Sequence, residues 1–122
     1  MERRDFEQIV AQALDELPQA FRDRLDNVEI VVEEWPDRET WQMAGVDHPA
    51  QLLGFYHGVP LTERSQGYTL VLPDKISLYR RPILLQCRTS EEVRATIQRV
   101  LRHEVAHYFG VSDDRLRELG GY

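Results

Sequence analysis

Two histidines and a glutamate near the end of the chain have the types and spacing of a metal site. The segment His103-Glu104-Val105-Ala106-His107 places two imidazoles four residues apart. On an α-helix, residues four apart project from one face, so both rings can bind the same ion. The glutamate between them is offset, where it can take a proton from a water that the metal activates. The pattern predicts one Zn²⁺, with His103 and His107 as ligands and Glu104 as the catalytic base.

A catalytic zinc site needs a third protein ligand and keeps one position open. Gly110 follows the motif, and a glycine there allows the chain to reverse direction after a helix. We therefore predict Asp113 as the third ligand. Asp114 is the nearest rival, because an error of one residue in the turn would exchange the two. Glu118 is the weaker choice, since it lies too close to His107 in the sequence for helix-to-helix ligation.

The helix that carries this motif is predicted to run from Thr89 to Gly110. Thr89-Ser90-Glu91-Glu92 has the form of a capping box, and no proline or glycine follows before Gly110. At ~100° per residue, Glu104 falls on the axis of an apolar stripe and the two histidines lie on its flank. The stripe consists of Val93, Ile97, Val100 and Leu101. Because an unpaired buried carboxylate is costly, this register favours a cation or a cavity beside Glu104.

The rest of the chain is expected to supply further helices and a small sheet. A helix is predicted over residues 6–17, capped by Asp5 and ended by Pro18, with a short helical turn at 21–25. Strands are predicted at residues 28–32, 52–57, 68–72 and 75–79, with a turn at Pro73-Asp74. Pro82 makes residues 83–87 an edge strand or a loop, and 113–119 a last short helix. The fold class is α+β, in one domain over residues 1–122.

Composition restricts the classes of partner. The chain has 122 residues and a net charge of −6, with its arginines interleaved among acids, so we expect no nucleic-acid or anionic-lipid partner. No apolar run approaches the ~20 residues that cross a bilayer, so we expect no membrane span. Cys87 is the single cysteine, and the N-terminal residues lack the apolar core of a signal peptide. We expect a cytoplasmic monomer.

The sequence resembles a known family at several places. The string His-Glu-x-x-His-x-x-Gly-x-x-Asp is similar to that of the minimal zincin-like metallopeptidases, a small bacterial family. Two middle blocks, 53–61 and 72–79, and the tail 112–120 also resemble that family. The resemblance implies a compact zincin-like fold, in which a twisted mixed sheet packs on the active-site helix. It also implies His103, His107 and Asp113 as zinc ligands and Glu104 as the base.

Two functions are weighed from the sequence. The first is a zinc-dependent metallopeptidase that hydrolyses extended peptides or proteins, with the strand at 75–79 holding substrate at a sheet edge. The alternative is a metal-binding interaction or regulatory domain without proteolytic activity, because few residues follow the motif to form the lower wall of a cleft. Glu104 favours catalysis, since a purely structural zinc ion needs no base.

Overall fold

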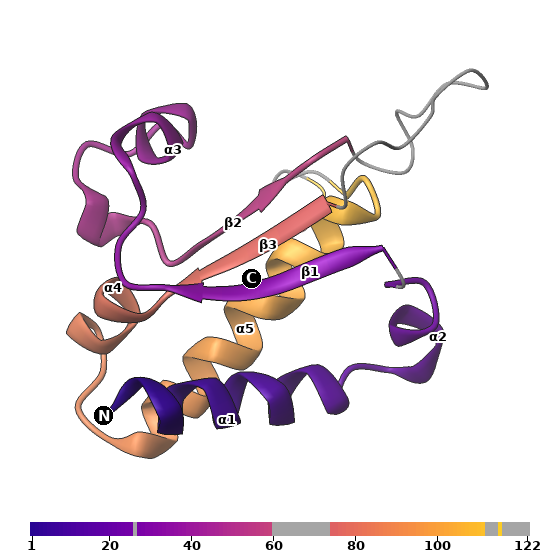
Figure 1. Ribbon diagram of the computed structural model, residues 1–122, viewed down its shortest axis with the longest axis horizontal. Helices are drawn as coiled ribbons and strands as arrows, with labels where there is room; N and C mark the ends of the chain where they lie inside the picture. The colour runs from indigo at the N-terminus through magenta and orange to yellow at the C-terminus, as the bar shows by residue number, and fades with distance from the viewer. Residues whose placement is uncertain (26, 60–73, 112–114, 116–122) are drawn as a thin grey trace.

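The computed structural model describes residues 1–25, 27–59, 74–111 and 115. Its elements form an α+β fold with a small mixed sheet, as predicted from the sequence (Figure 1). In chain order they are α1 (Arg3–Asp15), α2 (Gln19–Arg22), β1 (Val28–Glu33), α3 (Arg38–Met43), the short 3-10 helix η1 (Pro49–Gln51), β2 (Gly54–His57), β3 (Asp74–Tyr79), α4 (Arg80–Leu85) and α5 (Ser90–Tyr108). No described helix is both long and apolar enough to cross a membrane.

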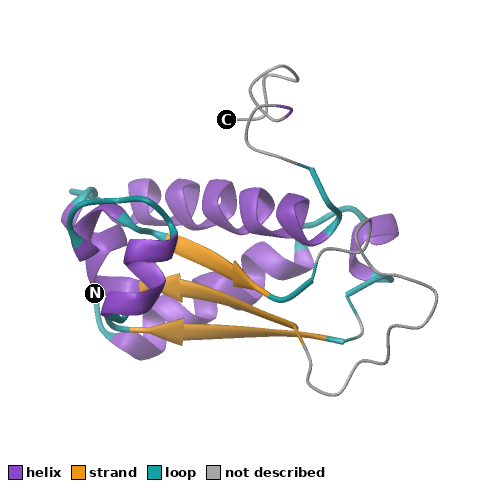
Figure 2. Cartoon of the chain, turned by 90° about the horizontal axis from the view of Figure 1, so that it is seen from above, coloured by secondary structure: helices purple, strands orange, loops and turns teal. Residues whose placement is uncertain are grey.

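The described sheet has three strands in the order β1-β3-β2. β1 and β3 are parallel, whereas β2 runs antiparallel to β3, as the arrow directions in Figure 2 show. The prediction that residues 75–79 form a sheet edge is therefore wrong, because β3 is hydrogen-bonded on both sides. Among the described strands, β2 is the edge strand on the side of α5, which it contacts.

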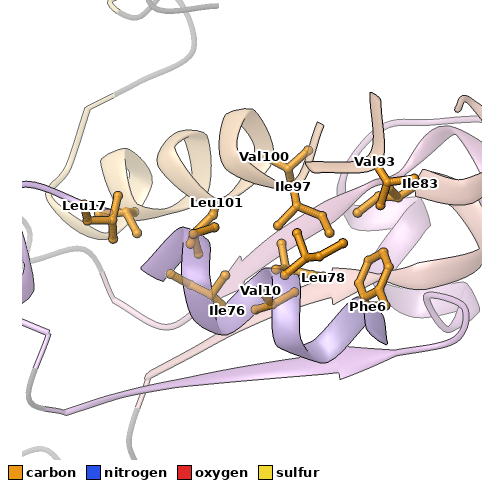
Figure 3. Packing of buried hydrophobic residues seen from close by; sticks show 13 residues of the cluster. Phe6, Val10, Leu17, Ile76, Leu78, Ile83, Val93, Ile97, Val100 and Leu101 are labelled. Atoms are coloured by element: carbon orange, nitrogen blue, oxygen red, sulfur yellow. The ribbon is translucent and has the colours of Figure 1, made fainter. Parts of the chain in front are cut away.

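The core lies between one face of this sheet and the helices α1 and α5. Figure 3 shows side chains from α1, β3 and α5 meeting in one cluster. Strand residues alternate between the two faces of a sheet, so β3 contributes every second residue, Ile76 and Leu78, to this cluster. The helices contribute residues at spacings of three and four, which were the basis for predicting them. These are Phe6, Ile9, Val10 and Ala13 from α1, and Val93, Ile97, Val100, Leu101 and Val105 from α5.

Two helices differ from the sequence prediction. Residues 83–87 were expected to form an edge strand or a loop, but Arg80–Leu85 is the helix α4. Pro82 is its third residue, and the first turn of a helix has no acceptor for the missing N–H, so proline is tolerated there. The helix α3 was not predicted. Its signal was Asp37, whose side chain caps the helix by accepting from the Thr40 N–H at 2.8 Å.

Smaller corrections concern element ends. α1 begins at Arg3, so Asp5 lies in its first turn and is not its cap; Glu2 occupies the cap position. The short second helix covers Gln19–Arg22 rather than residues 21–25. Asp74 begins β3 instead of standing in a turn. The strand predicted at 68–72 and the helix predicted at 113–119 lie outside the described residues, apart from Arg115.

Candidate metal centre

The helix α5 is held at both ends by local hydrogen bonds. At its start, the Thr89 hydroxyl accepts from the Glu92 N–H at 3.1 Å, and the Glu92 carboxylate accepts from the Arg88 N–H at 2.9 Å. The capping box predicts that the Glu92 side chain reaches back to Thr89, whereas it accepts from Arg88, one residue earlier. At its end, Gly110 has a φ of 85° and donates to the His107 carbonyl, while Val111 donates to the Ala106 carbonyl. This pair is the Schellman motif, which turns the chain after the motif as Gly110 predicted.

The face of α5 that carries Glu104 packs along β2. Val100, Glu104 and Tyr108 follow one another at intervals of four residues, and all three are buried. Gly54 of β2 lies against Val100, and Tyr56 stacks edge-on against Tyr108 with ring centroids 5.8 Å apart. Glu104 is one turn from each of these contacts, so its side chain lies between them, beside β2. The predicted burial of Glu104 on the core-facing side of the helix is confirmed.

The two imidazoles and the carboxylate form one donor cluster. His107 Nδ1 lies 3.1 Å from Glu104 Oε1, and His103 Nε2 lies 3.9 Å from Glu104 Oε2. The two imidazole rings have centroids 4.5 Å apart and are tilted by 71°. Each of the three residues has one potential metal-ligating atom, and these three atoms all lie within 4.8 Å of one another. The histidine side chains are 17% and 26% exposed, against 8% for Glu104, so the cluster opens toward solvent through the rings.

The donor chemistry of this cluster fits Zn²⁺. Imidazole nitrogen and carboxylate oxygen are ligands that zinc takes in proteins, at about 2.0–2.2 Å. A cation beside the buried carboxylate of Glu104 would also offset the cost of removing that charge from water. In this geometry Glu104 is also placed to act as a metal ligand, whereas the sequence analysis assigned it to proton transfer. Asp113, and its rivals Asp114 and Glu118, lie outside the described residues.

A groove adjoins the cluster on the side toward the start of α5. It has a volume of about 530 Å³ and runs between α5 and the segment that enters β2. Its lining residues are Gln51, Leu52, Leu53, Gly54, Gln86, Arg99, Val100, His103 and Glu104. Sequence reasoning did not assign a site role to the residues before β2, to Gln86 or to Arg99. Of these residues, only Arg99 could have been linked to the site from the sequence, because it precedes His103 by four residues and so shares its helix face.

The outer edge of β2 presents backbone groups next to this groove. Tyr79 donates its N–H to the Leu53 carbonyl at 2.9 Å, so Leu53 and Tyr79 form a hydrogen-bonded antiparallel pair. Hydrogen-bonded and non-hydrogen-bonded pairs alternate along such a ladder. With the observed register, the N–H and C=O groups of Gly54 and Tyr56 point away from β3. No described strand pairs with that edge.

The other titratable groups considered from the sequence are not members of the donor cluster. His57 alternates with Tyr56 and so points to the sheet face opposite α5, where burial and the charge of Lys75 lower its pKa. Burial raises the pKa of Tyr79 to about 12. Tyr108 donates its hydroxyl to the Arg24 carbonyl. Tyr68 and Tyr122, the other phenols considered for stabilising an oxyanion, lie outside the described residues.

Comparison with known proteins gives one family match and a similar solved structure. The family model described as zincin-like metallopeptidase matches residues 25–122, which include the whole cluster and groove. A search of curated proteins gives no match. Among solved structures, a conserved hypothetical protein from Thermo thermophilus is similar, with a TM-score of 0.57 and 24% identity over 98% of each chain. At that identity, the likeness concerns the fold alone.

Proposed function

The chain belongs to the zincin-like metallopeptidase family, and on this premise we propose that it is a zinc-dependent peptidase that hydrolyses peptide bonds. The observation that carries the proposal is the donor cluster on α5. Two half-buried imidazoles and one buried carboxylate lie together beside a groove and beside an edge of β2 with which no described strand pairs. A buried carboxylate lowers stability unless a charge or donor compensates it, and both His107 Nδ1, 3.1 Å away, and a metal ion held by the imidazoles can do so.

In the proposed site, His103 and His107 hold the metal from one face of α5, and Asp113 completes the protein ligands. Bound Zn²⁺ would polarise the scissile carbonyl and lower the pKa of a coordinated water toward ~7. The two histidines come from a helix fixed at both ends, so their relative positions depend little on the loops around them. The Schellman turn at Gly110 supports Asp113 as the third ligand, since it reverses the chain three residues before that position.

Glu104 carries the proton in this proposal. Its carboxylate lies within 4 Å of both rings, so a water held between them would be within reach of one carboxylate oxygen. Glu104 would take the proton from the attacking water and pass it to the nitrogen of the departing amine. Its buried position removes competing solvent, and its place between the β2 contacts fixes its orientation.

The substrate would lie in an extended conformation along the outer edge of β2. Gly54 and Tyr56 offer backbone donors and acceptors there, and their side-chain positions face α5 on either side of Glu104. In strand addition at such an edge, main-chain hydrogen bonds give affinity and pockets for alternate side chains give specificity. This assignment replaces β3, the strand favoured from the sequence.

Metal content tests the first half of the proposal. We expect near-stoichiometric zinc in the purified chain by elemental analysis, and its loss in His103→Ala and His107→Ala. Asp113→Ala and Asp114→Ala, compared directly, identify the third ligand, because only the ligand's removal should weaken zinc binding severely. His48→Ala is the matched control, since His48 is an exposed histidine that caps η1 and lies outside the cluster. Unchanged zinc content in both cluster variants would refute the metal site.

Cleavage tests the second half. Zinc-loaded protein is incubated with fluorescein-labelled casein and with a mixed pool of synthetic decapeptides, and products are read by mass spectrometry. We expect cleavage by the unmodified chain and a loss of at least about 100-fold in Glu104→Gln, which keeps the shape of the side chain but not its basicity. Zinc binding without any cleavage would instead favour the alternative, a metal-binding interaction domain.

A further inference from the structure

One residue gives the groove a fixed positive charge. Outside the metal cluster, the described residues that line the groove are apolar or neutral, except for Arg99. Gln51 and Gln86 are the neutral polar members, and Gln51 already accepts from two backbone N–H groups of the η1 cap. Outside the metal cluster, a ligand that fills the groove therefore meets apolar and neutral polar groups and one guanidinium.

The guanidinium of Arg99 is available to a ligand. Its neighbours on α5 are engaged within the chain: Arg94 donates to the Gln12 side chain at 2.6 Å, and Arg102 donates to the Gln98 carbonyl at 3.3 Å. Within the part of the chain that the structure describes, Arg99 has no ion pair or side-chain hydrogen bond, and its side chain is exposed. It precedes His103 by four residues, about 6 Å along the helix axis. That is close to two residues of an extended peptide.

The packing of β2 on α5 also gives the direction of a bound peptide. Gly54 contacts Val100, and Tyr56, two residues later, contacts Tyr108. The strand and the helix therefore run in the same direction. A peptide added antiparallel to β2, which is the more stable pairing, would run from the Tyr108 end toward the Arg99 end. The groove then receives residues on the C-terminal side of the scissile bond.

We propose that Arg99 makes this groove selective for a carboxylate on the C-terminal side of the cleaved bond. The carboxylate comes from an acidic side chain or from the free C-terminus of a short peptide. Arginine binds carboxylates through paired, charge-assisted hydrogen bonds, which gives it selectivity as well as affinity. The inference rests on the proposed function only in taking the groove as the peptide site.

Binding is measured without cleavage, using the full, zinc-loaded chain with Glu104→Gln. The probes are fluorescein-labelled decapeptides that differ at one residue near the C-terminus, Glu, Gln or Lys, each with a free or amidated C-terminus. We expect the Glu peptide to bind about tenfold more tightly than the Gln peptide, and the Lys peptide to bind most weakly. The amidated and free forms distinguish an acidic side chain from a terminal carboxylate as the source.

The variants then test the residue. Adding Arg99→Gln should abolish the preference, and Arg99→Glu should reverse it in favour of the Lys peptide. Arg102→Gln is the matched control, because it removes the same charge from the same helix outside the groove. A preference that survives Arg99→Gln, no preference at all, or no binding of any probe would overturn the inference.

Cleavage by the chain with Glu104 intact is scored separately. A preference that depends on Arg99, without cleavage of the bound peptides, keeps the inference and refutes the peptidase. Cleavage without any charge preference supports the peptidase and refutes the inference about Arg99.

Discussion

Replacing Gly54 with alanine tests whether the packing of β2 on α5 positions the site. An added Cβ would lie 2.6 Å from Val100 Cγ1, which is closer than carbon atoms approach without displacement. It would also lie 3.1 Å from the Ser77 carbonyl oxygen and 3.4 Å from Leu78 Cδ2. Valine is branched at Cβ and has few rotamers in a helix, so Val100 cannot easily rotate away. The strand and the helix must therefore separate.

The expected magnitude follows from two opposing terms. Overpacking a well-filled core costs about 1–3 kcal/mol. The φ of Gly54 lies outside the left-handed region, so alanine fits its backbone. Alanine also restricts the unfolded chain, which stabilises the fold by about 0.4–1 kcal/mol. We expect Gly54→Ala to lower the free energy of unfolding by about 0–2.6 kcal/mol. In a Val100→Ala background the closest contact is gone, and the same change should be within about 0.5 kcal/mol of neutral.

The assay is urea unfolding of the four proteins in a double-mutant cycle, with zinc content measured on each. We expect a coupling energy of about 1–2 kcal/mol between positions 54 and 100. Zinc content should fall in Gly54→Ala and recover in the double variant, because Glu104 and His103 follow Val100 within one turn. Equal costs of Gly54→Ala in both backgrounds would show that β2 does not pack on Val100 as described.

Three further predictions concern single contacts. Arg80 holds the pKa of Glu34 at about 2, below its usual 4.5. This pair therefore stabilises the fold above pH 4.5 and loses that effect as the pH falls toward 2. In Glu34→Gln, the temperature of thermal unfolding should depend less on pH between these two values. Thr89→Ala should cost about 1 kcal/mol in urea unfolding because α5 loses its cap, whereas Thr89→Ser should be near neutral. Tyr56→Phe removes the 2.7 Å hydrogen bond to buried Asp74 and should cost about 1–3 kcal/mol, and a cost below about 0.3 kcal/mol would contradict that contact.

The helix α5 and the register of its site residues were accessible from the sequence. The spacing of its apolar residues and the cap at Thr89 are local signals, because side chains within one or two turns determine them. The same periodicity indicated that Glu104 is buried. Fold class and the helix α1 were accessible for the same reason, although the first residue of α1 was not, since helix ends are held by few interactions.

The errors have two physical origins. Pro82 is compatible with an edge strand, a loop or the first turn of a helix, and only packing of α4 selects the last. The central place of β3 could not be read from local pattern either. β3 pairs with β1 from 46 residues earlier in the chain, and strand order depends on such distant contacts.

The sequence by itself determined which residues form the candidate metal site and their place on one helix face. The types and spacing of His103, Glu104 and His107 define a possible zinc site on any amphipathic helix, because helical geometry is set locally. Only the tertiary structure decided what surrounds that site. It placed β2 beside Glu104, at the edge of the sheet that the described strands form, and it brought Gln86 and Arg99 to one groove. These are contacts between distant segments, and their free energy comes from burying surfaces that the local sequence does not specify.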